Sequence, residues 1–185
     1  MEANESGTDD YRRGDRMELL REIAEWVSAS KFTEEDVEQG ALDRIVEAAR
    51  RAPSAKNRQP WRLIVARNPS VRKALYDSAF GEERVGQAPV IMALCTTNMD
   101  YRMPNGEQAY PIDIGIASAF LMLQARAEGL GARALTTYDE PQVREILTVP
   151  HLMRVVLLVL IGHTLEDSMQ KQRRPLNQIV SYDHW

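Results

Sequence analysis

The sequence feature that most constrains the fold is a helix that is apolar on almost every side. It is predicted over residues 111–131, PIDIGIASAFLMLQARAEGLG, where apolar residues cover nearly the whole circumference between Ile112 and Leu123. Such a helix has to be buried on almost all of its faces. A chain of 185 residues can hardly wrap it alone, so we expect a second subunit to cover part of it.

Short apolar runs alternate with amphipathic patterns, which indicates one α+β or α/β domain. The run VVLLVLIG at 155–162 is apolar throughout, so it is expected to be a central strand covered on both faces. Thr33 and Asp36 form a variant capping box, which predicts a helix beginning at residue 33. The expected strands are 62–66, 89–96, 132–137 and 155–162, and the expected helices are 17–30, 33–51, 69–79, 111–131 and 139–147.

The two ends of the chain differ from its centre. Residues 1–16 are polar and charged without an apolar core, so we expect a disordered leader followed by a single domain over 17–185. The last residues are polar as well. Their QIVSY piece could add as a strand to another sheet edge, including that of a partner subunit.

Composition narrows the class of protein. A formal net charge of −4 gives no general attraction to nucleic acid or to an anionic membrane. No apolar stretch reaches 18 residues and no secretory signal is visible, so we expect no membrane span and a cytoplasmic location. The single cysteine, Cys95, lies in the apolar run VIMALC, which is typical of a small buried residue in a reducing compartment.

Several motifs of catalytic chemistry are missing from the sequence. His151, His163 and His184 share no ligand spacing with one another or with Cys95, so no metal site is expected. No glycine-rich phosphate loop follows the first strand, and no G-x-S-x-G motif occurs. We therefore expect no catalytic side chain and predict that a bound cofactor carries the chemistry.

The connection at 51–61, RAPSAKNRQPW, is richer in prolines and hydrogen-bonding groups than a helix-to-strand connection needs. It resembles the flavin-contacting segment of the FMN-dependent nitroreductase family, Ala-Pro-Ser-x-x-Asn-x-Gln-Pro-Trp. Four further blocks follow in the family's order, and the resemblance covers roughly residues 17–185. These blocks are GQAPVIMAL, DIGIASAFLMLQARAEGLGA, VREILTVP followed by VVLLVLIGH, and KQRRPLNQIVSYDHW.

The resemblance implies a nitroreductase-like α+β fold. Its central sheet would be mixed and mainly antiparallel, with four to five strands flanked by helices and the C-terminal tail exchanged between subunits. It also implies an obligate homodimer with FMN at the interface. NAD(P)H would pass hydride to the flavin, and the flavin would reduce a small acceptor.

The resemblance assigns the flavin contacts to particular residues. Pro53, Ser54, Ala55 and Asn57 would face the ribityl chain and the ring edge, although Ser54 and Asn57 could instead only cap turns. Thr136 and Thr137 would offer backbone N–H groups near flavin N5 and O4, or else simply end a strand. Arg84 would lie beside the pyrimidine edge, where a positive charge stabilises the reduced flavin.

The phosphate contacts are where the sequence departs from the family. Relatives carry a basic run that grips the FMN phosphate, whereas this chain reads WVSAS at 26–30 and keeps only Ser28. Losing two basic groups should weaken FMN binding by several kcal/mol unless other charges substitute for them. The candidates are Lys171 and Arg173, which match the family's C-terminal Lys-x-Arg pair, together with Arg50, Arg51 and Arg174.

The leading hypothesis is therefore a homodimeric FMN-dependent oxidoreductase that passes hydride from NAD(P)H to a nitroaromatic, a quinone or a related small acceptor. Loop 98–110 and the region of helix 69–79 are expected to shape the choice of acceptor. One alternative is a specialised relative, such as a reductive dehalogenase or a flavin-consuming enzyme. The other is a non-catalytic or weakly flavin-binding dimer module, which the missing basic run favours.

Overall fold

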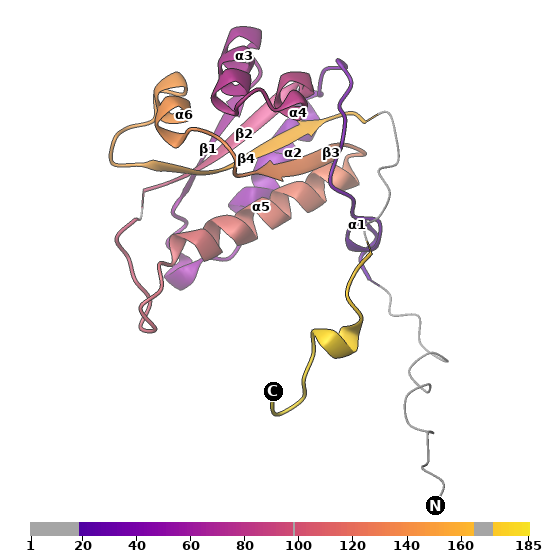
Figure 1. The fold of residues 1–185 in the computed structure, drawn as a ribbon, viewed down its shortest axis with the longest axis vertical. Coiled ribbons are helices and arrows are strands. Elements are labelled where there is room, and N and C mark those ends of the chain that lie inside the picture. Colours follow the sequence, from indigo (N-terminus) through magenta and orange to yellow (C-terminus); the bar gives the residue numbers. More distant parts are fainter. Residues whose placement is uncertain (1–18, 98, 165–171) are drawn as a thin grey trace, which may run out of the picture.

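The computed structural model describes residues 19–97, 99–164 and 172–185, so the predicted leader at 1–16 lies outside the described residues. Four strands form one sheet in the order β1-β2-β4-β3 (Figure 1). All pairings among the described strands are antiparallel, which confirms the α+β fold with a mainly antiparallel sheet. The strands are β1 (Trp61–Ala66), β2 (Val90–Thr96), β3 (Gly131–Leu135) and β4 (Arg154–Gly162).

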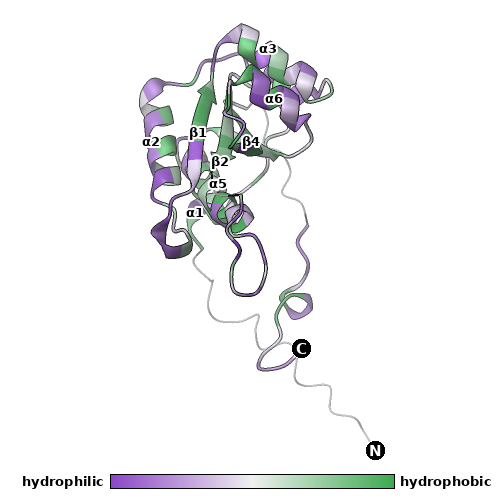
Figure 2. Cartoon of the chain, turned by 90° about the vertical axis from the view of Figure 1, so that its left-hand side faces the viewer, coloured by the Kyte–Doolittle hydropathy of each residue, from purple (hydrophilic) through white to green (hydrophobic). Residues whose placement is uncertain are grey.

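Helices cover both faces of this sheet. The helices α2 (Gln39–Arg50) and α5 (Tyr110–Ala127) pack on one face, and α3 (Pro69–Ser78), α4 (Glu83–Gln87) and α6 (Glu140–Ile146) pack on the other (Figures 1 and 2). The central strands are therefore covered on both sides, and every residue of β2 is buried, whereas the edge strand β1 leaves Arg62 and Val65 exposed. This arrangement explains the continuous apolar runs in β2 and β4.

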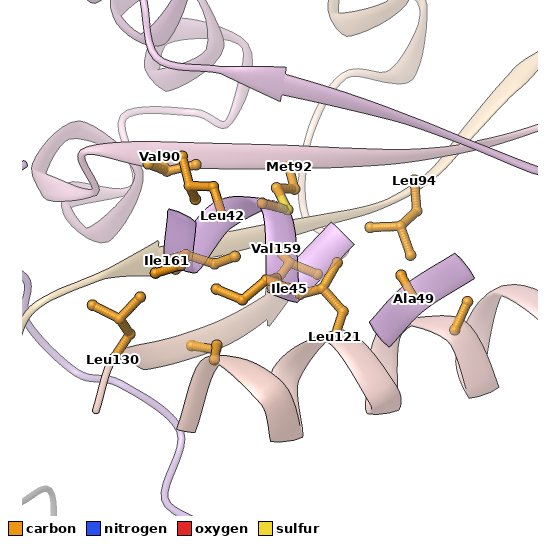
Figure 3. Close-up of a cluster of buried hydrophobic side chains, with 14 of the residues drawn as sticks. Leu42, Ile45, Ala49, Val90, Met92, Leu94, Leu121, Leu130, Val159 and Ile161 are labelled. Carbon is orange, nitrogen blue, oxygen red and sulfur yellow. The ribbon is translucent and has the colours of Figure 1, made fainter. Parts of the chain in front are cut away.

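The core between the sheet and the α2/α5 layer is aliphatic. Leu42 and Ile45 of α2 and Leu121 of α5 meet Met92 and Val159 of the sheet (Figure 3). These α2 positions are spaced as an amphipathic helix requires. The core fixes where α5 begins, and the candidate site lies beside that end of the helix.

Hydrogen bonds between residues close in sequence define the helix ends. Asn68 Oδ1 accepts the Ser70 N–H at 2.9 Å at the start of α3, and Asp139 Oδ1 accepts the Gln142 N–H at 3.0 Å at the start of α6. The helix α5 ends at Ala127, and the φ of +76° at Gly129 allows a Schellman turn in which the Leu130 N–H donates to the Ala125 carbonyl at 2.9 Å.

The N-terminal helix predictions are wrong in extent. The predicted helix 17–30 is reduced to α1 (Arg21–Ala24), which has no buried residue. The following segment is extended, because the Ala29 N–H donates to the Ala132 carbonyl of β3 at 3.1 Å and buries Ala29 against the sheet edge. A contact with a distant strand therefore overrides the local helical pattern.

The predicted start of the next helix at residue 33 is also wrong, because α2 begins at Gln39. Thr33 Oγ1 accepts the Glu35 N–H at 3.2 Å, and Asp36 pairs with Arg67 at 2.6 Å. Thr33 therefore stabilises a turn and Asp36 forms an ion pair, both before the start of α2. Farther along, β3 ends at Leu135, two residues before the predicted end of that strand.

The all-round burial expected of α5 is incomplete within one chain. Ile112 is 51% exposed and Phe120 is 41% exposed on the side that faces away from the sheet. The described part of the tail contains one short turn, η3 (Leu176–Gln178), and leads away from the body of the fold in Figure 1. QIVSY forms no strand within the described chain, and its apolar side chains are exposed.

Candidate flavin site

The connection between α2 and β1 is a tight loop held by its own polar groups. It contains the turn η2 (Ala55–Asn57) and three non-glycine residues with left-handed backbone: Lys56 (φ 53°), Asn57 (φ 54°) and Gln59 (φ 49°). Ser54 Oγ accepts the Gln59 N–H at 2.9 Å, and Gln59 Nε2 donates to Asn57 Oδ1 at 3.1 Å. Such backbone persists only where the surroundings fix it, so the loop is rigid.

A buried carboxylate joins this loop to the first turn of α5. Asp113 Oδ1 accepts the Ala55 N–H at 2.9 Å, and the Asp113 side chain is only 2% exposed. Its other oxygen, Oδ2, has no hydrogen-bond partner among the described residues. The positive end of the α5 dipole favours a negative charge at this position. Asp113 therefore fixes the position of the loop relative to the first turn of α5.

Loop 99–109 lies against the same segment. The guanidinium carbon of Arg58 is 3.7 Å from the centroid of the Tyr101 ring. A hydrogen bond from Arg58 lowers the pKa of the Tyr101 hydroxyl, and the charge of Lys56 acts in the same direction. Two segments that the sequence analysis singled out separately are thus neighbours in the fold.

A second group of predicted residues lines a cavity of about 480 Å³ at the β3 edge of the sheet. Its volume falls in the range of about 300–1,000 Å³ that is common for small-molecule sites. The cavity brings together Arg84 and Thr137, both of which the resemblance had assigned to the flavin ring edge. The lining residues are Ser30, Lys31, Ala79, Phe80, Gly81, Glu82, Glu83, Arg84, Gln87 and Thr137.

The charge of Arg84 is already balanced. Its guanidinium pairs with the Glu82 carboxylate through two nitrogens, with Nη2 to Oε2 at 2.9 Å. The pair raises the pKa of Arg84 and lowers that of Glu82. The Lys31 ammonium, by contrast, has no ion pair or hydrogen bond with any residue that the structure describes.

Among the residues that the structure describes, the predicted phosphate contacts are spread over the end of α2, the segment before Ala29 and the tail. Arg51 Nε lies 2.8 Å from Glu47 Oε1, and Arg50 binds the same carboxylate, so the two arginines lower the pKa of Glu47 to about 2. Ser28 is exposed before Ala29, and Arg173 is exposed in the tail. Lys171 lies outside the described residues.

The two groups of site residues lie far apart within one copy. The loop with Ser54 and Asn57 precedes β1, at one edge of the sheet and beside α5. The cavity with Arg84 and Thr137 lies at the β3 edge, beside α4 on the other face. Three strand spacings alone separate these edges by roughly 14 Å. Within one chain the two groups therefore lie at opposite edges and on opposite faces of the sheet.

Three residues of the site escaped the sequence analysis. Phe80 is 72% exposed at the cavity mouth with a φ of +57°, and Lys31 lines the same cavity. Lys31 directly follows the stretch where the basic run is missing, which was an available signal. The hydrogen bond from the loop to Asp113 had no signal in the sequence, because the two residues are 58 positions apart.

Other chemistry finds little support in the described residues. Residues 19–97, 99–164 and 172–185 contain no group of three or more His, Cys, Asp or Glu side chains arranged to hold a metal ion. Within the same ranges, no helix has both the length and the apolar character that crossing a bilayer requires. Cys95 is buried as predicted, and burial raises the pKa of its thiol to about 11, so it is a structural residue.

Comparisons with known proteins agree with the fold and the motifs. The sequence model described as "Nitroreductase family" matches residues 23–89 and 79–163. A protein named NADH dehydrogenase from Thermus thermophilus is 30% identical, over 83% of this chain and 90% of the relative. A protein named FMN reductase [NAD(P)H] from Bacillus subtilis is 28% identical, over 85% of this chain and 70% of the relative.

The solved structures agree as well. A nitroreductase family protein from Clostridium difficile 630 superposes with a TM-score of 0.79 at 27% identity, covering 91% of this chain and all of that one. The matched residues include the rigid loop, the cavity and α5. The chain therefore belongs to the nitroreductase family.

Proposed function

We propose that the chain is a homodimeric FMN-dependent oxidoreductase. It takes hydride from NAD(P)H and reduces a small acceptor such as a nitroaromatic or a quinone, with residues 17–185 acting as one cytoplasmic domain. Family membership and the relative named FMN reductase [NAD(P)H] support this assignment. The observation that carries it is that one chain presents both a rigid loop and a cavity that holds Arg84 and Thr137.

The residues present fit a flavin. A flavin ring is flat and mostly apolar, with hydrogen-bonding atoms along its edges. The loop offers short side chains on fixed backbone, and the cavity offers cations and Thr137, which follows Thr136 just after the end of β3. When FMN is bound, NAD(P)H gives it two electrons and a proton as hydride and becomes NAD(P)⁺, so the reduced ring carries one negative charge until the acceptor takes the electrons.

The separation of the two groups supports a dimer in which each site is shared. In a two-fold symmetric dimer, the loop of one subunit can face the cavity of its partner, and the reverse holds at the second site. The exposed side of α5, with Ile112 and Phe120, gives the partner an apolar surface to cover. The exposed tail residues Leu176, Ile179 and Tyr182 would then pack on the other subunit.

Each group has a separate task in this proposal. The loop holds one side of the flavin in place through Pro53, Ser54, Ala55 and Asn57. Asp113 keeps this loop in position by its hydrogen bond to the Ala55 N–H. The cavity residues bind the ring edge, where backbone N–H groups near Thr137 orient it. The cofactor supplies the electrons, so none of these side chains has to act as a general acid or a nucleophile.

A second candidate is a dimer that binds flavin weakly or has lost catalysis. Two observations favour it. Residues 26–30 contain no basic side chain, and Arg51 already forms an ion pair with Glu47 instead of being available for the phosphate. The phosphate grip then depends on Lys171 and Arg173. Lys171 and Arg173 changed together to alanine should weaken FMN binding if they hold the phosphate, and unchanged affinity would exclude them.

Purification without added flavin separates the two candidates. The proposed oxidoreductase should retain a yellow flavin that denaturation releases, and anaerobic NADH or NADPH should bleach its absorbance. The protein should sediment as a dimer. A colourless protein that does not retain added FMN would contradict the proposed function and favour the non-catalytic module.

A further inference from the structure

We propose that Lys31 is the cation that stabilises the negative charge of the reduced flavin in the cavity at the β3 edge. This inference rests on the proposed function. Its basis is that Lys31 and Arg84 line the same cavity, but only Lys31 is free of a counter-charge among the described residues.

The backbone around Lys31 is held in place on both sides. The Ala29 N–H donates to the Ala132 carbonyl at 3.1 Å, and Arg133 Nη1 donates to the Ala29 carbonyl at 3.1 Å. On the other side, the Thr33 N–H donates to the His163 carbonyl at 2.9 Å, and Phe32 is buried in the core. The buried residues before and after Lys31 fix its position while its own side chain stays exposed.

Two glycines allow this segment to lie so close to the sheet. A Cβ on Gly162 would lie 3.1 Å from Phe32 Cδ1, and a Cβ on Gly131 would lie 3.1 Å from the Ala29 Cβ. Gly131 and Gly162 are cross-strand partners at the ends of β3 and β4. The absence of side chains at this pair therefore seats the segment that carries Lys31.

The charges that line the cavity are two cations and two carboxylates. Glu82 binds Arg84 in a fork, so the field of that guanidinium is largely cancelled before any ligand enters. Arg133 is partly buried beside Arg84 and donates to the Ala29 carbonyl. Lys31 adds an ammonium on a flexible four-carbon stem, which can turn to an anion without first breaking an ion pair.

The consequence is a difference between the two redox states of the cofactor. The oxidised ring is neutral and gains little from Lys31, whereas the reduced ring carries a negative charge and gains a charge-assisted interaction. Removing the ammonium should weaken binding of reduced flavin about tenfold more than binding of oxidised flavin, which corresponds to about 30 mV for a two-electron couple. Arg84 remains in place in both cases.

The test compares the Lys31→Met variant with the wild-type dimer. Dissociation constants for oxidised and reduced flavin, and the midpoint potential against a reference dye, should be measured with FMN and with riboflavin. We expect the potential to fall by about 30 mV with both ligands, because the affected charge is on the ring that they share. Lys31→Arg should restore the wild-type value.

Lys73→Met is the matched control, because Lys73 is also exposed but pairs with Asp77 on α3 at 2.7 Å, outside this cavity. It should leave the potential unchanged. A Lys31→Met variant that binds flavin with the wild-type potential would overturn the inference. A Lys31→Met variant that binds FMN more weakly but riboflavin as tightly as the wild type would also overturn it, because Lys31 would then bind the phosphate and not the ring. If the wild-type protein binds neither flavin, the proposed function fails and this inference fails with it.

Discussion

The Gly162→Ala substitution tests whether close packing against β4 seats the segment that carries Lys31. A Cβ at residue 162 would lie 2.5 Å from Pro89 Cδ and 3.1 Å from Phe32 Cδ1, whereas ordinary contacts begin at 3.4 Å. Roughly 1 Å of additional room is needed, and the rigid, buried ring of Pro89 cannot provide it by changing rotamer. The backbone segments at Gly162 and Pro89 are therefore expected to move apart, and Phe32, which the same Cβ would touch, is expected to shift with them.

Overpacking of this kind costs about 1–3 kcal/mol of the free energy of unfolding. In a domain of this size that corresponds to a fall of about 3–10 °C in melting temperature, measurable by circular dichroism on the flavin-free protein. Flavin affinity should fall as well, because Lys31 moves with Phe32. Gly40→Ala is the control, since its new Cβ meets only flexible side chains of α2 at 3.4 Å or more. A melting temperature that stays at the wild-type value in Gly162→Ala would refute the reasoning.

Three further substitutions test other parts of the structure. Asp113→Ala should weaken FMN binding about tenfold by releasing the loop, whereas Asp113→Asn keeps an acceptor for the Ala55 N–H and should retain the wild-type FMN affinity. An equal loss of FMN affinity in both variants, measured by fluorescence titration, would exclude the anchoring role of Asp113. Phe120→Glu should shift the sedimentation coefficient from dimer to monomer, because it places a charge on the exposed face of α5. The folded-state pKa of Glu47 is lowered from 4.5 to about 2, so its contribution to stability is present above pH 4.5 and is lost as the pH falls toward 2. In urea unfolding at a series of pH values, Glu47→Gln should reduce the dependence of the free energy of unfolding on pH between 4.5 and 2. A pH dependence equal to that of the wild type would contradict the ion pairs.

Local patterns were sufficient for much of the fold. The apolar runs predicted all four described strands, and the runs of β2 and β4 are the most continuous because helices cover both faces of these central strands. Asp139 and Gly129 marked helix ends through hydrogen bonds to neighbours in sequence. The loop at 51–61 was recognisable because its composition is unusual for a connection.

What the sequence could not supply were the contacts between distant residues. Nothing near Ala29 signals that it pairs with Ala132, so a helical pattern was predicted where the chain is extended. The pairing of Arg84 with Glu82 likewise depends on side-chain geometry, and in our proposal the expected electrostatic role passes from Arg84 to Lys31. The division of the site residues between two sheet edges follows from the strand order, which the pattern of apolar runs does not determine.

The central claim is that each flavin site combines the loop of one subunit with the cavity of the other, and mixing two damaged subunits tests it most directly. One variant carries Ala55→Trp in the loop, and the other carries Lys31→Glu together with Arg84→Glu in the cavity. Each variant alone should bind no FMN. After dissociation and reassociation at equal amounts, we expect about a quarter of the wild-type FMN capacity, because half of the dimers are mixed and each mixed dimer has one intact site. No recovery of binding in mixed dimers that are shown to form would contradict a shared site.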